Sequence, residues 1–184
     1  MSTSAILATE RVRLLKRSEY DRLVELGAFE DERLELLHGI IVAMSPQHAP
    51  HAWAVQCLTK LLVRALGDRG DVRVQLPFIA SDDSEPEPDV AVVVLQDYSE
   101  EHPSKALLII EVADESIHRD LEIKPAIYAA SGVADYWVVD IQKRCVHVHR
   151  DPVGSHYGAI EQLRDSVSPL AFPDLAIRLA DIVG

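Results

Sequence analysis

Cysteine is scarce in this chain of 184 residues: there are two, and they form neither a CxxC motif nor a disulfide framework. This usage suits a reducing compartment. Long apolar runs are also missing. The run at 90–95 falls far short of the ~20 residues that a membrane span needs, and residues 1–7 have no basic region followed by a long apolar segment. We therefore expect a cytoplasmic protein with no membrane partner.

Basic residues are outnumbered, because 18 Lys and Arg face 30 Asp and Glu and give a net charge of −12. Non-specific binding to a phosphate backbone is driven by cationic neutralisation and counterion release, so this charge opposes a general nucleic-acid coat. Clustered acids are nevertheless what hard cations need. A metal-dependent nuclease with weak non-specific affinity for DNA remains compatible with this composition.

Length and apolar content (48%) allow one well-buried core and are short for two, so we expect a single domain over 1–184. Helical spacing and cap residues predict helices at 18–27, 50–66 and 120–131. A hairpin is predicted at 33–37 and 40–44, and strands at 71–80, 89–95, 106–113, 135–140 and 145–150, with a further strand and irregular structure in the tail. Two strands, a helix and two more strands indicate an α/β sheet with a crossover.

Two acids stand at the ends of apolar strands. Glu111 follows 107–110, which contains no polar residue, and Asp89 stands at the head of the run 90–95. A buried charged acid needs a cation, a hydrogen-bond network or a metal as partner. If the two strands are neighbours, ~4.8 Å apart, both carboxylates can reach one divalent ion. The pattern therefore indicates a divalent-metal site.

An ordered set of motifs resembles the Uma-type restriction endonuclease family, a branch of the PD-(D/E)XK nuclease superfamily. The resemblance covers roughly 30–150 and rests on LELLHG at 34–39, Ser45-Pro46, His51, SEPEPDVAVV at 84–93, IEVADES at 110–116, Asp120, Lys124, and YAASGVADYWVVD at 128–140. It implies a restriction-endonuclease-like fold of the α/β class, with a central mixed β-sheet flanked by helices. It also implies metal-dependent hydrolysis of DNA phosphodiester bonds.

Position by position, the resemblance makes Asp89 and Glu111 the ligands of Mg²⁺ or Mn²⁺ and Glu35 a candidate third acid. The family's superfamily normally places a lysine two residues after the second acid, where this chain has Ala113. The resemblance gives the role of that lysine to Lys124. Pro125 follows directly, and a proline disfavours helical geometry in the residue before it, so the aim of Lys124 stays open.

Several polar residues near these motifs allow two interpretations each. His51 could touch the scissile phosphate or cap its helix, and Gln75 could hold a catalytic water or make a structural hydrogen bond. We predict that Asp120 is a helix N-cap rather than a ligand. Cys145, His147 and His149 share one strand face, but same-face neighbours are ~6.8 Å apart, too far for three zinc ligands to converge easily, so a polar outer face is predicted.

The leading hypothesis is therefore a DNA endonuclease in which Asp89, Glu111, Lys124 and Glu35 are catalytic. The alternative is a nuclease-like fold that is weakly active or inactive and serves as a binding or assembly module. Ala113 in the usual lysine position and the net charge of −12 motivate this alternative. A homodimer is plausible because cutting both strands of a duplex needs two sites.

Overall fold

The computed structural model describes residues 12–114 and 116–183. Its centre is a six-stranded mixed sheet in the order β3-β4-β5-β6-β7-β8. β5 and β6 run parallel, and the other neighbouring pairs of this sheet are antiparallel. The predicted α/β class with a central mixed sheet is confirmed. The strands are β3 (Asp71–Val74), β4 (Val90–Val93), β5 (Leu108–Ala113), β6 (Asp135–Asp140), β7 (Cys145–Val153) and β8 (His156–Leu163).

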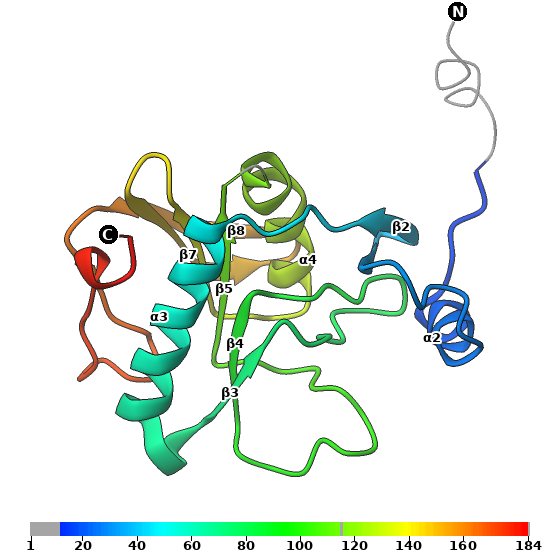
Figure 1. Ribbon diagram of the computed structural model, residues 1–184, viewed down its shortest axis with the longest axis horizontal. Helices are drawn as coiled ribbons and strands as arrows, with labels where there is room; N and C mark the ends of the chain where they lie inside the picture. The colour runs from blue at the N-terminus through cyan, green and yellow to red at the C-terminus, as the bar shows by residue number, and fades with distance from the viewer. Residues whose placement is uncertain (1–11, 115, 184) are drawn as a thin grey trace, which may run out of the picture.

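Helices cover both faces of this sheet (Figure 1). The parallel pair β5–β6 needs a crossover, which is supplied by a π-helical turn, η2 (Arg119–Ile123), continued by α4 (Lys124–Ala130). The opposite face is covered by α3 (Ala49–Leu66), which η1 (Gly67–Arg69) joins to β3. The central strands β4, β5 and β6 are buried throughout, as their continuous apolar runs predict.

A smaller unit lies beside the sheet, at the end of the molecule where Figure 1 labels α2 and β2. It contains α2 (Arg17–Glu25) and the hairpin of β1 (Leu34–Leu37) and β2 (Ile40–Ala43). Leu36 and Glu85 form an isolated β-bridge that attaches the hairpin to the loop before β4. This attachment brings the hairpin residues next to the acids of the central sheet.

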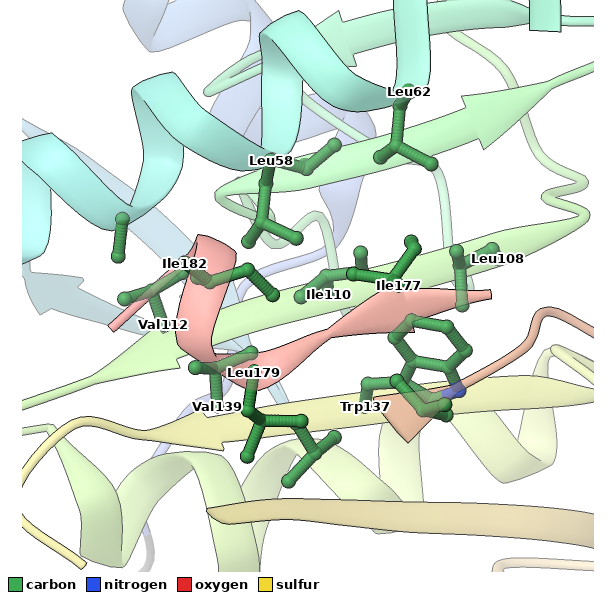
Figure 2. Packing of buried hydrophobic residues seen from close by; sticks show 14 of the residues in the cluster. Leu58, Leu62, Leu108, Ile110, Val112, Trp137, Val139, Ile177, Leu179 and Ile182 are labelled. Carbon is green, nitrogen blue, oxygen red and sulfur yellow. The ribbon is translucent and has the colours of Figure 1, made fainter. Parts of the chain in front are cut away.

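The core has one apolar cluster on each face of the sheet. Figure 2 shows Leu58 and Leu62 of α3 facing Ile110 of β5, with residues of the C-terminal segment packed beside them. That segment contributes β9 (Ser166–Val167), β10 (Ile177–Arg178) and η3 (Leu179–Asp181). On the other face the cluster is formed by Phe78, Ala91, Val93, Ile109, Ala113, Tyr128, Ala129, Val133, Tyr136, Val138 and Tyr157.

Most predicted elements are confirmed within a few residues, and two differ. The strand predicted at 71–80 ends at Val74, because Gln75 adopts a left-handed φ of 52° and leaves the sheet. The helix predicted at 120–131 is already under way before Asp120. The tail contains the predicted further strand, β8, and then irregular structure with the short elements β9, β10 and η3. Phe172 and Ile177 of this irregular part are buried in the core.

Two sequence expectations concern residues outside the described part of the chain: the absence of a targeting signal at 1–7, and the motif position Glu115. Among the described helices, none is both long and apolar enough to cross a membrane.

We expect Leu58→Ala to lower the free energy of unfolding by about 2–5 kcal/mol, because Leu58 is fully buried between α3 and the sheet and truncation leaves a cavity. Val63→Ala is the matched control on the same helix, where the side chain is 53% exposed. The control is expected to change stability by less than about 0.5 kcal/mol. Urea denaturation measures both, and equal losses for the two variants would contradict this packing.

The stability that Glu85 contributes where the hairpin attaches depends on pH. Burial raises the pKa of Glu85 to about 7, and the charge of Asp21 adds to this while Arg17 opposes it. The folded protein therefore holds a proton at Glu85 more strongly than the unfolded chain between about pH 4.5 and 7. The stability that this residue contributes is lost as the pH rises through that window.

Accordingly, raising the pH from 5 to 8 should lower the free energy of unfolding of the wild type by about 1–3 kcal/mol more than that of Glu85→Gln. The measurement is urea denaturation of both proteins at each pH. Parallel pH profiles for the two proteins would show that Glu85 is not held protonated in the folded state.

Candidate active site

Asp89 and Glu111 are neighbours across the sheet. Val90 of β4 pairs with Ile110 of β5 in an antiparallel ladder, so Asp89, one residue before Val90, lies opposite Glu111, one residue after Ile110. The adjacency that the sequence argument assumed is therefore confirmed. Both carboxylates are buried, with 7% and 3% of their residue surface exposed.

Asp89 is held by three donors from three separate segments of the chain. Its Oδ2 accepts a hydrogen bond from the backbone N–H of Val112 at 2.9 Å and lies 3.1 Å from Nε2 of His51. Its Oδ1 accepts a bond from the side-chain amide of Gln75 at 3.2 Å. Burial works to raise the pKa of Asp89, but the hydrogen bond and charge of His51 outweigh it, and the pKa is lowered. Asp89 is ionised at neutral pH.

Glu111 lies in a different environment. Its Oε1 accepts hydrogen bonds from Nζ of Lys124 and from the hydroxyl of Tyr128, both at 2.8 Å. Burial acts to raise the pKa of Glu111; Lys124 opposes this shift, whereas the charges of Asp120 and Asp89 add to it. The carboxylates around Glu111 thus repel one another, and a further cation among them would relieve that repulsion.

Lys124 is buried between two acids. Nζ lies 2.8 Å from Oε1 of Glu111 and 3.1 Å from Oε2 of Glu35, and 1% of the residue is exposed. Burial acts to lower the pKa of Lys124, but the charges of Glu111 and Glu35 outweigh it and hold the pKa well above its usual range. The amine therefore stays protonated at neutral pH, as a fixed positive charge.

The π-helical turn explains how Lys124 points inward although Pro125 follows it. The backbone N–H of Lys124 donates to the carbonyl of Arg119, five residues back, and Lys124 keeps helical angles of φ −62° and ψ −32°. A π-turn holds one residue more than an α-turn, and such turns are common at functional sites. The helix continues through Pro125. The sequence left the direction of the Lys124 side chain open, and in the structure it points toward Glu111.

Glu35 lies behind Lys124, fully buried on β1. Besides Lys124, it has Arg119 at 3.4 Å and the backbone N–H of Glu87 at 3.3 Å. It does not line the cavity in which the other predicted residues meet. The structure thus brings Glu35 into the cluster as a neighbour of Lys124, behind the residues that line the cavity.

Asp120 is not the helix N-cap that the sequence predicted. Its backbone N–H already donates to the carbonyl of Ser116 at 3.1 Å, and its side chain accepts a hydrogen bond from the Ser116 hydroxyl. Asp120 is 1% exposed, and its buried Oδ1 has no hydrogen-bond partner among the described residues; Nε of Arg119 lies 4.0 Å from it. The sequence analysis named Asp120 as a motif position but assigned it to a helix cap, although its position four residues before Lys124 placed it on the same helix face.

A cavity joins most of these groups. Asp89, Glu111 and Asp120 contribute carboxylates to it, and Lys124 contributes its amine. Of the two predicted substrate contacts, His51 lines the cavity, whereas Gln75 does not and contacts it only through Asp89. The full lining is Arg33, Met44, Ser45, Pro46, Gln47, His48, His51, Asp89, Glu111, Asp114, Ser116, Arg119, Asp120 and Lys124. Such a set can bind a hard divalent cation and present positive charge to an anion.

Comparison with known proteins identifies related chains. The model of the Uma2 family, described as "Putative restriction endonuclease", matches residues 17–180. A crystal structure of a "putative nuclease belonging to DUF820" from Anabaena variabilis superposes with a TM-score of 0.68 at 15% identity, over 89% of this chain and 96% of that one. At this identity the likeness concerns the fold. No curated protein matches the chain.

We expect Glu35→Ala to lower the free energy of unfolding by about 3–5 kcal/mol, because it leaves the buried ammonium of Lys124 with one carboxylate fewer. Glu32→Ala, at an exposed position before β1, is the control and is expected to change stability by less than about 0.5 kcal/mol. Chemical denaturation measures both. Should Glu35→Ala be as stable as Glu32→Ala, the buried pair would have no structural role.

Proposed function

Because the chain belongs to the Uma2 restriction endonuclease family, we propose that it is a Mg²⁺- or Mn²⁺-dependent endonuclease that hydrolyses phosphodiester bonds in DNA. The observation that carries the proposal is the shared cavity, in which the carboxylates of Asp89 and Glu111 meet the amine of Lys124. Acids for a metal and a cation for the phosphate are the two requirements of this chemistry.

The residues of the cavity fit a hard cation. Asp89 and Glu111 supply carboxylate oxygens from adjacent strand ends, and Mg²⁺ and Mn²⁺ prefer oxygen donors. Asp120 adds a buried oxygen to which no described residue donates a hydrogen bond. We assign Asp89 and Glu111 as the metal ligands and Asp120 as a further oxygen donor. When bound, the ion supplies Lewis acidity and lowers the pKa of a bound water.

Lys124 takes the place of the lysine that the superfamily carries on the strand. Its amine stays protonated, so in this proposal it stabilises the negative charge that develops on the phosphoryl oxygens and does not act as a general base. Tyr128 and Glu35 act through other residues: Tyr128 orients Glu111, and Glu35 positions Lys124.

His51 and Gln75 orient the first carboxylate. Both contact Asp89, and the hydrogen bond to Asp89 raises the pKa of His51 against the effect of burial. Nδ1 of His51 is buried with no hydrogen-bond partner in the described structure. Since His51 also lines the cavity, we propose that it contacts the scissile phosphate, whereas Gln75 is a positioning residue.

Basic side chains also line the cavity, although the chain as a whole is acidic. Besides Lys124 they are the arginines Arg33 and Arg119. These few cations can contact phosphates near the cut, but a net charge of −12 opposes long-range attraction. We therefore propose that the protein binds DNA only weakly outside the active site. We also propose that cutting both strands of a duplex requires a second copy of the chain.

The alternative is a nuclease fold that binds but does not cut. It is favoured by one observation: Lys124 is already held by two carboxylates, at 2.8 and 3.1 Å, which weakens its hold on a phosphate. Under this alternative the protein would bind a divalent ion and give no turnover on duplex, single-stranded or branched DNA and RNA.

The test is nicking of supercoiled plasmid by the purified protein with Mg²⁺ or Mn²⁺, and with a chelator. We expect metal-dependent nicking that Glu111→Gln, Asp89→Asn and Lys124→Met each lower by about 100-fold or more, because each removes a metal ligand or the cation that faces the phosphate. Glu122→Gln is the matched control, since Glu122 is exposed on the π-helical turn that also carries Asp120.

Calorimetric titration with Mn²⁺ separates the hypotheses. Loss of Mn²⁺ binding in Glu111→Gln, together with loss of nicking, is expected for the endonuclease. Mn²⁺ binding without any nicking would favour the binding module. Equal nicking rates for the wild type and Glu111→Gln would contradict the assignment of this site.

A further inference from the structure

A second group of metal-ligating side chains lies at the closed end of the hairpin formed by β6 and β7. Asp140 is the last residue of β6 and pairs directly with Cys145, the first residue of β7. His147 follows two residues later on the same face. One ligand atom from each of these three residues lies within 4.8 Å of the other two. Asp140 and Cys145 are buried, and His147 is partly exposed.

Two of the three ligand-atom distances agree with tetrahedral coordination, and the third, between Cys145 and Asp140, is within 4.8 Å. Nε2 of His147 lies 3.6 Å from Sγ of Cys145 and 3.7 Å from Oδ2 of Asp140. Zinc binds sulfur at ~2.3 Å and nitrogen or oxygen at ~2.0–2.2 Å, so ligand atoms of a tetrahedral site are roughly 3.3–3.7 Å apart. The three side chains therefore surround a position that one zinc-sized ion fits after small adjustments.

A catalytic triad would need a different arrangement. In a Cys-His-Asp triad the thiol and the carboxylate contact opposite nitrogens of the imidazole. Here Sγ of Cys145 and Oδ2 of Asp140 both approach the same nitrogen, Nε2 of His147. Convergence of three donors on one point is the arrangement of a metal site, not of a proton relay.

Asp140 is oriented in advance for such a role. Its Oδ1 accepts the backbone N–H of Lys143 at 2.8 Å, which leaves Oδ2 directed at the cluster. Hydrogen bonds of this kind fix ligating carboxylates in metal sites. The Nζ of Lys143 lies 3.4 Å from Oδ2, but this side chain is 62% exposed and can turn into solvent.

This arrangement corrects the sequence interpretation of the strand. Cys145 and His149 are buried, so the predicted polar outer face is wrong. His149 does not join the cluster; its ring lies 5.4 Å from that of Tyr136 and 5.6 Å from that of Tyr157. The spacing argument against three ligands on one strand holds, but the third donor comes from the neighbouring strand.

We propose that Asp140, Cys145 and His147 form a site for a borderline-soft divalent ion of the zinc class, with the fourth position open to water. One thiolate, one carboxylate and a neutral imidazole balance the charge of the ion, and the thiol proton is released on binding. Asp140 pairs with Ala113, two residues beyond Glu111 on β5. An ion here would link β6 and β7 beside the strand end that carries the candidate active site.

Cobalt substitution tests the proposal. The chelator-treated, reduced protein is titrated with Co²⁺ in the presence of excess Mg²⁺. We expect one equivalent of Co²⁺ to bind with a near-ultraviolet thiolate-to-cobalt charge-transfer band, and Zn²⁺ to displace it. Cys145→Ser should abolish the band, and Asp140→Asn should weaken binding by about 10–100-fold. Cys57→Ser is the matched control, because Cys57 lies on α3 away from this cluster, and it should keep the band.

His147→Gln keeps the test decisive if Cys145→Ser fails to fold, since His147 is partly exposed and its substitution should also remove the band. A band that persists in Cys145→Ser, or its absence from the folded wild type, would overturn the proposal. Glu111→Gln should retain the band in full. This last comparison tests the two proposals independently. If the proposed nuclease function is wrong, plasmid nicking will not be seen, but the cobalt spectrum will be unaffected.

Discussion

The ammonium of Lys124 lies between Glu111 and Glu35, with almost no contact to water. Removing three charges from water costs several kcal/mol per ion, and their attraction offsets this cost only when the geometry is good and the remaining polar atoms are bonded. The three residues come from the helical crossover, the central sheet and the β1–β2 hairpin. This interaction therefore requires all three elements to be placed correctly at once.

That requirement accounts for features that would otherwise be unrelated. The hairpin must be attached to the sheet, and the bridge between Leu36 and Glu85 does this. The crossover helix must aim a lysine at β5 despite the proline that follows, and the π-helical turn does this. Ala113, two residues after Glu111 on β5, packs in the core, so the amine beside Glu111 comes from the crossover helix.

The two donor sets differ in chemistry but occupy neighbouring strand ends. Oxygen donors gather where β4 begins and β5 ends, whereas a thiol and an imidazole join a carboxylate where β6 ends and β7 begins. Hard cations prefer the first set and borderline-soft cations the second. β5 carries Glu111 of the first set and β6 carries Asp140 of the second, and these two strands are hydrogen-bonded neighbours in the sheet.

Sequence patterns were sufficient for the order of helices and strands, because apolar periodicity and cap residues act locally. They also placed Asp89 and Glu111 at strand ends, and the family motifs linked them to Lys124. The end of β3 at Val74 could not be predicted in this way, since the left-handed Gln75 follows from its bonds to the backbone carbonyls of Pro88 and Asp89.

The burial of Asp120 and the joining of Asp140 to Cys145 and His147 were likewise decided only in three dimensions. Strand register and helix phase determine which side chains share a point in space, and both depend on packing between distant segments. The sequence by itself determined the chemical groups, their elements and the class of fold. The tertiary structure decided which groups meet, because that depends on contacts among residues far apart along the chain.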